Sequence, residues 1–252
     1  MDFRMESLAN EKIGWNKTWS FEGSQSWYPD EQVIRFFAGY YAKRIGSHGQ
    51  YVKYKVPDKA LVGVDFGCGP GRHMLAMQQH QIHAHGIDLS NVVVANANAL
   101  LRENGYAENA VVGSLSEMQF ANDQFDLGVC HGVLDHMTSE IRAKSISEIA
   151  RTLRKKAKIL ISFISENDSA FGEGTQIDEN TWTVADGFEK DLPQSFFNVE
   201  RILEELKEFN VISLTEVTNK TILGRSLIGT DKHYAVDSRY YVVAEKNDKY
   251  KT

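Results

Sequence analysis

Two carboxylates and a run of alternating glycines are the residues whose types and spacing predict a binding site in this chain. Asp65 is followed by Gly67, Gly69 and Gly71, and a second carboxylate, Asp88, follows roughly 20 residues later. Glycine lets the backbone approach a ligand closely, and the amides at the start of a following helix favour an anionic group. A carboxylate accepts hydrogen bonds without donating any, so Asp88 suits a pair of sugar hydroxyls. The pattern predicts a nucleotide-binding turn.

Three closely spaced histidines raise the question of a metal site. They occur as His80-x-x-His83-x-His85, a spacing that spans the end of a predicted helix and the following strand. No carboxylate accompanies them to complete a ligand set. We therefore predict no metal in this protein.

The two carboxylates need parallel strands to bring them together. Buried strands are predicted at residues 61–65, 82–87, 110–113, 125–130 and 159–164. Helices are predicted between them, over residues 74–79, after Ser90 and after Thr138, where each of the two hydroxyl residues is placed to cap its helix. The run Arg154-Lys155-Lys156 is expected at the negative end of the last of these helices.

The first fifty residues are rich in aromatic side chains. A helix is predicted from about residue 30 to residue 44, with its aromatic residues packed on the body. The aromatic residues before it lie in a polar, glycine-containing segment, where they either pack similarly or form a lid over a ligand; they are Trp15, Trp19, Trp27 and Tyr28.

Residues 165–194 form a polar stretch that is too long for an ordinary connection, which favours a cover over a substrate. A helix capped by Asn198 follows, with its apolar face at Val199, Ile202, Leu203 and Leu206. Strands at residues 211–218 and 240–244 complete the chain without an intervening helix. The predicted fold is α/β, a doubly wound, mostly parallel, Rossmann-like sheet of seven strands with an antiparallel last strand.

Composition restricts the class of protein. The chain has 252 residues, 42% of them hydrophobic, which is enough for the core of one domain. A net charge of -6 gives no broad cationic surface, so we expect no nucleic-acid partner. Two cysteines form no disulfide framework, and no leader or long apolar span occurs, so a cytoplasmic protein without a membrane partner is expected.

The glycine turn differs from a dinucleotide fingerprint. That fingerprint has a third glycine three residues after the second, where this chain has Arg72. The order Asp65-x-Gly67-x-Gly69-x-Gly71 resembles instead the class I S-adenosylmethionine-dependent methyltransferases of small molecules. Three further motifs follow in the family's order: Gly86-Ile87-Asp88-Leu89-Ser90, Gly113-Ser114-Leu115, and the segment from Phe125 to His136.

The resemblance implies a position for each part of S-adenosylmethionine. Its methionyl part would meet Asp65 and the turn Gly67-Cys68-Gly69-x-Gly71, and its ribose hydroxyls would bind Asp88. Its adenine would lie against Leu89, Ser114 and Leu115. Cys130 and His131, at the end of the fourth strand, would lie beneath the methionyl chain near the methyl group.

Asp65 supports this cofactor over a dinucleotide. A buried carboxylate needs a partner, and an ammonium group would satisfy it whereas a pyrophosphate would be repelled. The alternative is that Asp65 accepts from amides of the glycine turn. Arg72 either meets the cofactor carboxylate or is solvated at the surface.

A proton acceptor is expected in the segment His131-Gly132-Val133-Leu134-Asp135-His136. His136 precedes a helix whose positive end favours a neutral imidazole, as a base requires, and it is either the base or a structural residue of the loop. His131 is expected to contact cofactor or substrate. The segment is similar to the Val-Leu-Glu-His of ubiquinone-pathway O-methyltransferases, but Gly132 replaces a further acidic residue of theirs.

The leading hypothesis is methyl transfer to an oxygen, and less readily a nitrogen, of a small molecule such as a sugar derivative, a phenol or a secondary metabolite. A cofactor-binding protein without transferase activity and a nicotinamide oxidoreductase are the alternatives. One domain is predicted over residues 1–252: an aromatic lid (1–50), a cofactor-binding core (51–164), a substrate cover (165–197), and a final helix and strand pair (198–252).

Overall fold

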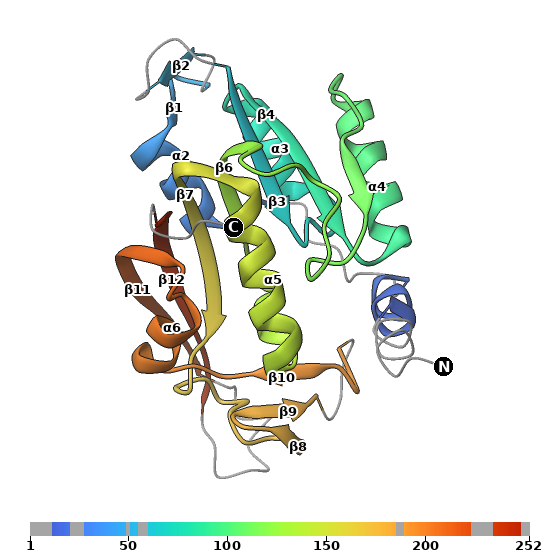
Figure 1. The fold of residues 1–252 in the computed structure, drawn as a ribbon, viewed down its shortest axis with the longest axis vertical. Coiled ribbons are helices and arrows are strands. Elements are labelled where there is room, and N and C mark those ends of the chain that lie inside the picture. Colours follow the sequence, from blue (N-terminus) through green and yellow to red (C-terminus); the bar gives the residue numbers. More distant parts are fainter. Residues whose placement is uncertain are drawn as a thin grey trace.

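The fold is known from a computed structural model, which describes residues 12–20, 28–48, 51–54, 60–184, 189–222 and 234–247. A seven-stranded sheet runs through the molecule in the order β11-β12-β7-β6-β3-β4-β5 (Figure 1). The strands are β3 (Leu61–Phe66), β4 (Ile82–Asp88), β5 (Ala110–Val112), β6 (Phe125–Cys130), β7 (Leu153–Ile164), β11 (Phe209–Ile222) and β12 (Tyr234–Lys246). Strands β3 to β7 pair in parallel, and β12 is antiparallel to both of its neighbours. The predicted fold class is confirmed.

Helices cover both faces of this sheet and enclose one apolar core on each. Helices α2, α3 and α4 pack on one face, and α5 and α6 pack on the other. Their bounds are α2 (Glu31–Tyr40), α3 (Arg72–Gln79), α4 (Asn91–Glu103), α5 (Ser139–Thr152) and α6 (Val199–Glu205). No helix within the described ranges is both long and apolar enough to cross a membrane.

The glycine turn joins β3 to α3 as the sequence predicts. Gly67, Gly69 and Gly71 all have positive φ angles, of 74°, 50° and 88°, which favour glycine. The amides of Gly67 and Cys68 donate to the carbonyl of Ile87 at the end of β4. The turn is therefore fastened to the neighbouring strand before any ligand binds.

The helix predicted from residue 30 to residue 44 is too long. Helix α2 ends at Tyr40, and the chain then forms β1 (Ala42–Ile45), which pairs antiparallel with β2 (Tyr51–Tyr54). The Tyr41 hydroxyl donates to the Asp126 carbonyl and accepts from the Lys158 amide. This anchor on β6 and β7 holds the chain at the point where the helix stops.

One further prediction about elements is wrong, and another, the helix capped by Asn198, is confirmed as a helix with that cap but only in part for its apolar face. The basic run does not end a helix, because α5 stops at Thr152 and β7 begins at Leu153; Arg154 pairs instead with Asp126 at 2.5 Å. In α6, Ile202 is fully buried, whereas 39% of Val199 and 49% of Leu203 are exposed. The periodic pattern of this helix is therefore only half used for packing.

The segment after β7 contains a small sheet of its own. Its strands are β8 (Thr175–Asp178), β9 (Thr181–Thr183) and β10 (Pro193–Ser195), in the order β10-β9-β8. This sheet lies beyond the N-terminal end of α5 (Figure 1), where β10 contacts the 3-10 helix η1 (Leu134–His136). We refer to residues 165–197 as the cover segment.

A short helix over residues 12–19, here called the N-terminal helix, lies beside the first turn of α4 (Figure 1). The Asn16 side chain accepts from the Ser90 hydroxyl at 2.7 Å and donates to Asn91 Oδ1 at 3.0 Å. No helix is predicted here from the sequence, because the segment is short and polar. Side-chain bonds to α4 position it.

Candidate active site

A cavity with about 640 Å³ of empty space, partly open to solvent, lies at the carboxyl ends of β3, β4, β5 and β6. In open α/β sheets this edge is where ligands bind. The cavity is lined by Trp15, Trp19, Gly67, Asp88, Leu89, Gly113, Ser114, Leu115, Gly132, Val133, His136, Met137 and Ile141. Seven of the predicted site residues therefore line one cavity: Trp19, Gly67, Asp88, Leu89, Ser114, Leu115 and His136.

Asp88 ends β4 at the wall of the cavity. Its Oδ2 accepts from the Gly69 amide at 3.0 Å, and its Oδ1 accepts from the Ser90 amide at 2.9 Å. Burial raises the pKa of Asp88 to about 6, although these two amides act to lower it. The carboxylate is thus held rigidly by backbone donors and still has lone pairs to offer a ligand.

Asp65 lies at the end of β3 with only 1% of its surface exposed. Neither of its carboxylate oxygens has a hydrogen-bond partner among the residues that the structure describes, and His73 Nδ1 is 3.7 Å from Oδ2. The amides of the glycine turn bond elsewhere, to Ile87 and Asp88, so the alternative considered for Asp65 is not what the structure shows. A buried, unsatisfied carboxylate is costly, which makes Asp65 a candidate for a cationic ligand.

The glycine turn is too crowded for larger residues at two of its positions. A Cβ atom on Gly67 would lie 2.3 Å from Val133 Cγ2, and one on Gly71 would lie 2.9 Å from Ala97 Cβ. At Gly69 the nearest atom would be Trp19 Cζ2 at 3.6 Å, so the indole lies over the turn. Cys68 is buried, and burial raises the pKa of its thiol.

Arg72 opens α3 and is not simply solvated. Its guanidinium donates to the Tyr28 carbonyl at 3.1 Å and lies 3.5 Å from His131 Nδ1. Arg72 therefore connects the chain ahead of α2 to the end of β6. Tyr28 itself is 84% exposed and does not reach the cavity. Trp27 lies outside the described residues.

His131 belongs to a cluster of polar residues beside the cavity. Its Nε2 is 3.3 Å from Asp30 Oδ2, which also accepts from the Tyr241 hydroxyl at 3.1 Å. Burial lowers the pKa of His131, although Asp30 acts to raise it, so the ring is neutral near pH 7. Cys130, the residue before, is fully buried in the core, where burial raises the pKa of its thiol.

His136 lines the cavity from η1. Its Nδ1 lies 3.1 Å from the Pro193 carbonyl in β10, and its Nε2 lies 3.8 Å from Glu189 Oε1. Trp15 packs edge-on against the ring, with 5.3 Å between ring centroids. A carbonyl can only accept, so Nδ1 carries a proton, and in the neutral ring Nε2 is the nitrogen with a free lone pair.

The residues that sequence reasoning missed come from distant segments. Asp30 was interpreted only as part of a helix start, and Glu189 and Pro193 only as part of a polar stretch. Nothing in their local pattern connects them to His131 or His136. Trp15 is different, because its aromatic character in a polar segment had already suggested a lid.

No group of three or more metal-ligating side chains is arranged to hold an ion in the described ranges. His80 is buried, and its Nδ1 contacts the Ala76 carbonyl at 2.8 Å. His83 points to solvent and His85 packs on Phe125. The three histidines thus have separate surroundings.

Comparison with known proteins gives one family and a shared fold. Residues 64–156 match the family model described as "Methyltransferase domain". The sequence matches no curated protein. Similar solved structures include a S-adenosylmethionine-dependent methyltransferase from Methanosarcina mazei, 17% identical, with 75% of this chain and 93% of that chain covered at a TM-score of 0.61.

Two other solved structures match over nearly the whole chain. One is a chain of the complex between the Haloferax volcanii Trm112 methyltransferase activator and the putative methyltransferase, 14% identical, with 97% and 100% covered at a TM-score of 0.64. The other is the [4+2]-cyclase SpnF, 17% identical, with 96% and 94% covered at a TM-score of 0.57. At these identities the structural matches establish the fold.

Proposed function

Because this chain belongs to the class I S-adenosylmethionine-dependent methyltransferases, we propose that it transfers a methyl group to an oxygen of a small, largely apolar molecule. One observation carries the proposal. A single cavity is bordered by Asp88, which suits a ribose, and by His136, whose Nε2 has a free lone pair. A carboxylate suited to a ribose and a proton acceptor therefore border one space.

The residues at the carboxyl ends of β3 and β4 fit the cofactor. Asp65 has two unpaired, buried oxygens that an ammonium group would satisfy, and Asp88 would accept from the ribose hydroxyls. Leu89, Ser114 and Leu115 would border the adenine. Bound S-adenosylmethionine supplies a methyl group already activated on a sulfonium sulfur.

The protein's task is then to align an acceptor and to take its proton. We assign the proton to Nε2 of His136, because Nδ1 is already bound to the Pro193 carbonyl. Glu189, 3.8 Å from Nε2, would stabilise the imidazolium that forms. His131 is assigned to contact with cofactor or substrate, held by Asp30.

The acceptor class is proposed from the remaining lining of the cavity. Its side chains near His136 are Trp15, Val133, Met137 and Ile141, which are aromatic or aliphatic. Such a wall favours a phenol or another apolar alcohol over a sugar, whose hydroxyls would lack partners. The N-terminal helix and the cover segment lie close together, since a Cβ atom on Gly14 would lie 3.0 Å from Leu192 Cδ2. Together they would exclude water from the reaction.

The proposal is tested first by binding and then by turnover. Isothermal titration should show binding of S-adenosylmethionine, and a panel of phenols, sugars and amines with a labelled methyl group should show transfer to phenols first. No binding would remove the proposal. Binding with transfer only to amines would correct the acceptor atom.

The role of His136 is tested against a control histidine, His83, which lies outside the cavity. His136→Asn should lower kcat by about 10²- to 10⁴-fold, the usual contribution of a general base, and should leave cofactor affinity unchanged. His83→Asn, at an exposed position of β4, should alter neither quantity. Equal kcat values in the two variants would show that His136 does not take the proton.

A further inference from the structure

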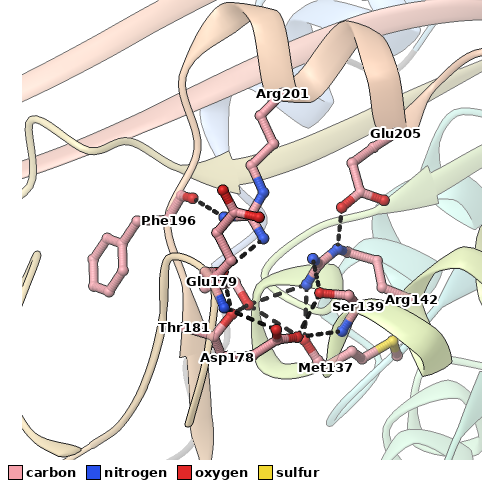
Figure 2. Close-up of polar contacts among 10 residues, drawn as sticks. Met137, Ser139, Arg142, Asp178, Glu179, Thr181, Phe196, Arg201 and Glu205 are labelled. Carbon is pink, nitrogen blue, oxygen red and sulfur yellow. Dashed lines mark hydrogen bonds and ion pairs between the residues drawn. The ribbon is translucent and has the colours of Figure 1, made fainter. Parts of the chain in front are cut away.

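A fully buried arginine joins the cover segment to the loop that carries His136. Arg142 has 0% of its surface exposed and lies in the first turns of α5. Its Nε donates to Glu205 Oε1 at 2.7 Å, and one terminal nitrogen donates both to the Met137 carbonyl at 2.8 Å and to Ser195 Oγ at 3.1 Å (Figure 2). The other terminal nitrogen reaches Ser139 Oγ at 3.4 Å. One guanidinium therefore binds the residue that follows η1, strand β10 and helix α6 together.

The Met137 carbonyl and Ser195 Oγ, which bind the same nitrogen of Arg142, are each close in sequence to one partner of the hydrogen bond between His136 and Pro193. Met137 is the residue after His136, and Ser195 lies in β10 two residues after Pro193. The His136 Nδ1 contact with the Pro193 carbonyl spans the same gap at 3.1 Å. Ser195 Oγ adds a second link across the gap, because it also donates to the Met137 carbonyl at 3.3 Å. The contacts of Arg142 and Ser195 thus bridge the same two segments as the contact between His136 and Pro193.

We propose that Arg142 is a positioning residue for methyl transfer, because it holds His136 in the tautomer with the proton on Nδ1. This inference rests on the proposed role of His136 as the proton acceptor. If β10 moved away, the Pro193 carbonyl would no longer select Nδ1 as the protonated nitrogen, and Nε2 would be protonated in part of the molecules. A ring protonated on Nε2 cannot take the acceptor's proton at that atom.

A second arginine nearby offers a matched control. Arg201, in α6, also lies over the Phe197 ring, at 4.7 Å compared with 5.0 Å for Arg142. It donates to the carbonyls of Phe196 and Glu179, away from η1 (Figure 2). Arg201 therefore stabilises the same part of the cover segment without contacting either partner of the His136 bond.

The experiment is nitrogen NMR on the full chain with labelled histidine, because the shifts of the two ring nitrogens report the tautomer directly. It is done without acceptor, at a pH where titration shows the ring to be neutral. The variants are Arg142→Lys, Ser195→Ala and Arg201→Lys. Lysine keeps the charge, but one ammonium cannot bind Glu205, Met137 and Ser195 together.

We expect His136 to be protonated on Nδ1 in the wild type and in Arg201→Lys. A fraction protonated on Nε2 should appear in Arg142→Lys, and a smaller one in Ser195→Ala, which keeps the arginine. If Arg142→Lys folds, the tautomer of His136 in that variant decides whether the proposal holds. If it does not fold, the tautomer in Ser195→Ala decides. The proposal is overturned if the deciding variant keeps the wild-type tautomer, or if Arg201→Lys changes it equally.

Kinetics separate this inference from the proposed function. In Arg142→Lys kcat should fall by about 10²-fold, the usual effect of a misplacement near 1 Å, while the KM for S-adenosylmethionine stays unchanged. A full kcat in His136→Asn would reject the proposed base, although the tautomer would still report whether Arg142 positions the ring. A changed tautomer with a full kcat in Arg142→Lys would reject the positioning role in catalysis.

Discussion

The two sides of the cavity are built in different ways. On the side of β3 and β4, amides of the glycine turn bind the end of one neighbouring strand: the Gly67 and Cys68 amides donate to the Ile87 carbonyl, and the Gly69 amide donates to the Asp88 carboxylate. On the side of η1, side chains meet from segments far apart in the sequence. His136 contacts Trp15 from the N-terminal helix and Pro193 from the cover segment.

This difference in construction suits two different tasks, binding the cofactor and selecting the acceptor. Bonds between backbone groups depend little on side-chain identity, so this side depends mainly on the glycines that the turn requires and on the Asp88 carboxylate. Contacts between distant side chains change whenever one of the segments changes. We therefore assign the cofactor to the first side and the choice of acceptor to the second. Rigidity on the first side and adjustable contacts on the second are what the following predictions test.

The largest effect is expected on the stability of the glycine turn, at the β3 and β4 side of the cavity. Gly71→Ala should lower the free energy of unfolding by about 2–5 kcal/mol, because alanine at φ 88° is strained and its Cβ would lie 3.0 Å from the Ala97 Cα of α4. Urea denaturation measures the change. The expected loss exceeds that of strain alone, since a helix backbone cannot move away as a side-chain end can.

Gly105→Ala is the matched control, because Gly105 has a similar φ of 80° and nothing lies within 4 Å of the added atom. Strain alone should cost about 1–2 kcal/mol there. Equal losses at the two positions would mean that close packing of the turn on α4 adds nothing. Such a result would not support the view that the β3 and β4 side of the cavity is more rigid than the η1 side.

The cofactor side could be predicted from the sequence because its signals are local. The buried strand before Asp65, the alternating glycines and the carboxylate at the end of β4 each specify a short piece of backbone. Parallel strands then bring their carboxyl ends to one edge of the sheet, as the sheet order shows. Local signals do not predict the surroundings of Asp65, whose oxygens have no hydrogen-bond partner within the described part of the chain.

The acceptor side could be predicted only in outline. The length and polarity of the cover segment favour a cover over a substrate, which stays a prediction, and they contain no signal for the three strands within it or for the contact between His136 and Pro193. The same limit explains α2, whose helical pattern continues past Tyr40 although Tyr41 is bound to β6 and β7. Long-range contacts override local preference at each of these places.

The next effect concerns the charge of Asp88. Burial raises the pKa of this carboxyl to about 6, so about a tenth of it is ionised at pH 5 and most of it at pH 7. The ionised form makes the stronger bonds to ribose hydroxyls. The affinity for S-adenosylmethionine should therefore rise about tenfold between pH 5 and pH 7, as isothermal titration at each pH would measure.

Asp88→Asn is the control for this pH dependence, since an amide of the same shape does not titrate. Its affinity should be weaker at pH 7 and should lose the tenfold rise. A rise of the same size in Asp88→Asn would assign the pH dependence to another group, and the carboxylate would then act through its shape alone.

The smallest effect is expected on the side built from distant contacts. Asn16→Ala removes the bonds from Ser90 and to Asn91 that hold the N-terminal helix on α4, at a cost of about 1 kcal/mol. Hydrogen exchange of residues 12–19 should become about fivefold faster, while global unfolding changes little. Lys17→Ala, at an exposed position of the same helix, should leave exchange unchanged. If Asn16→Ala instead lowers global stability as much as Gly71→Ala does, the N-terminal helix is part of the rigid body, and the acceptor side is no more adjustable than the cofactor side.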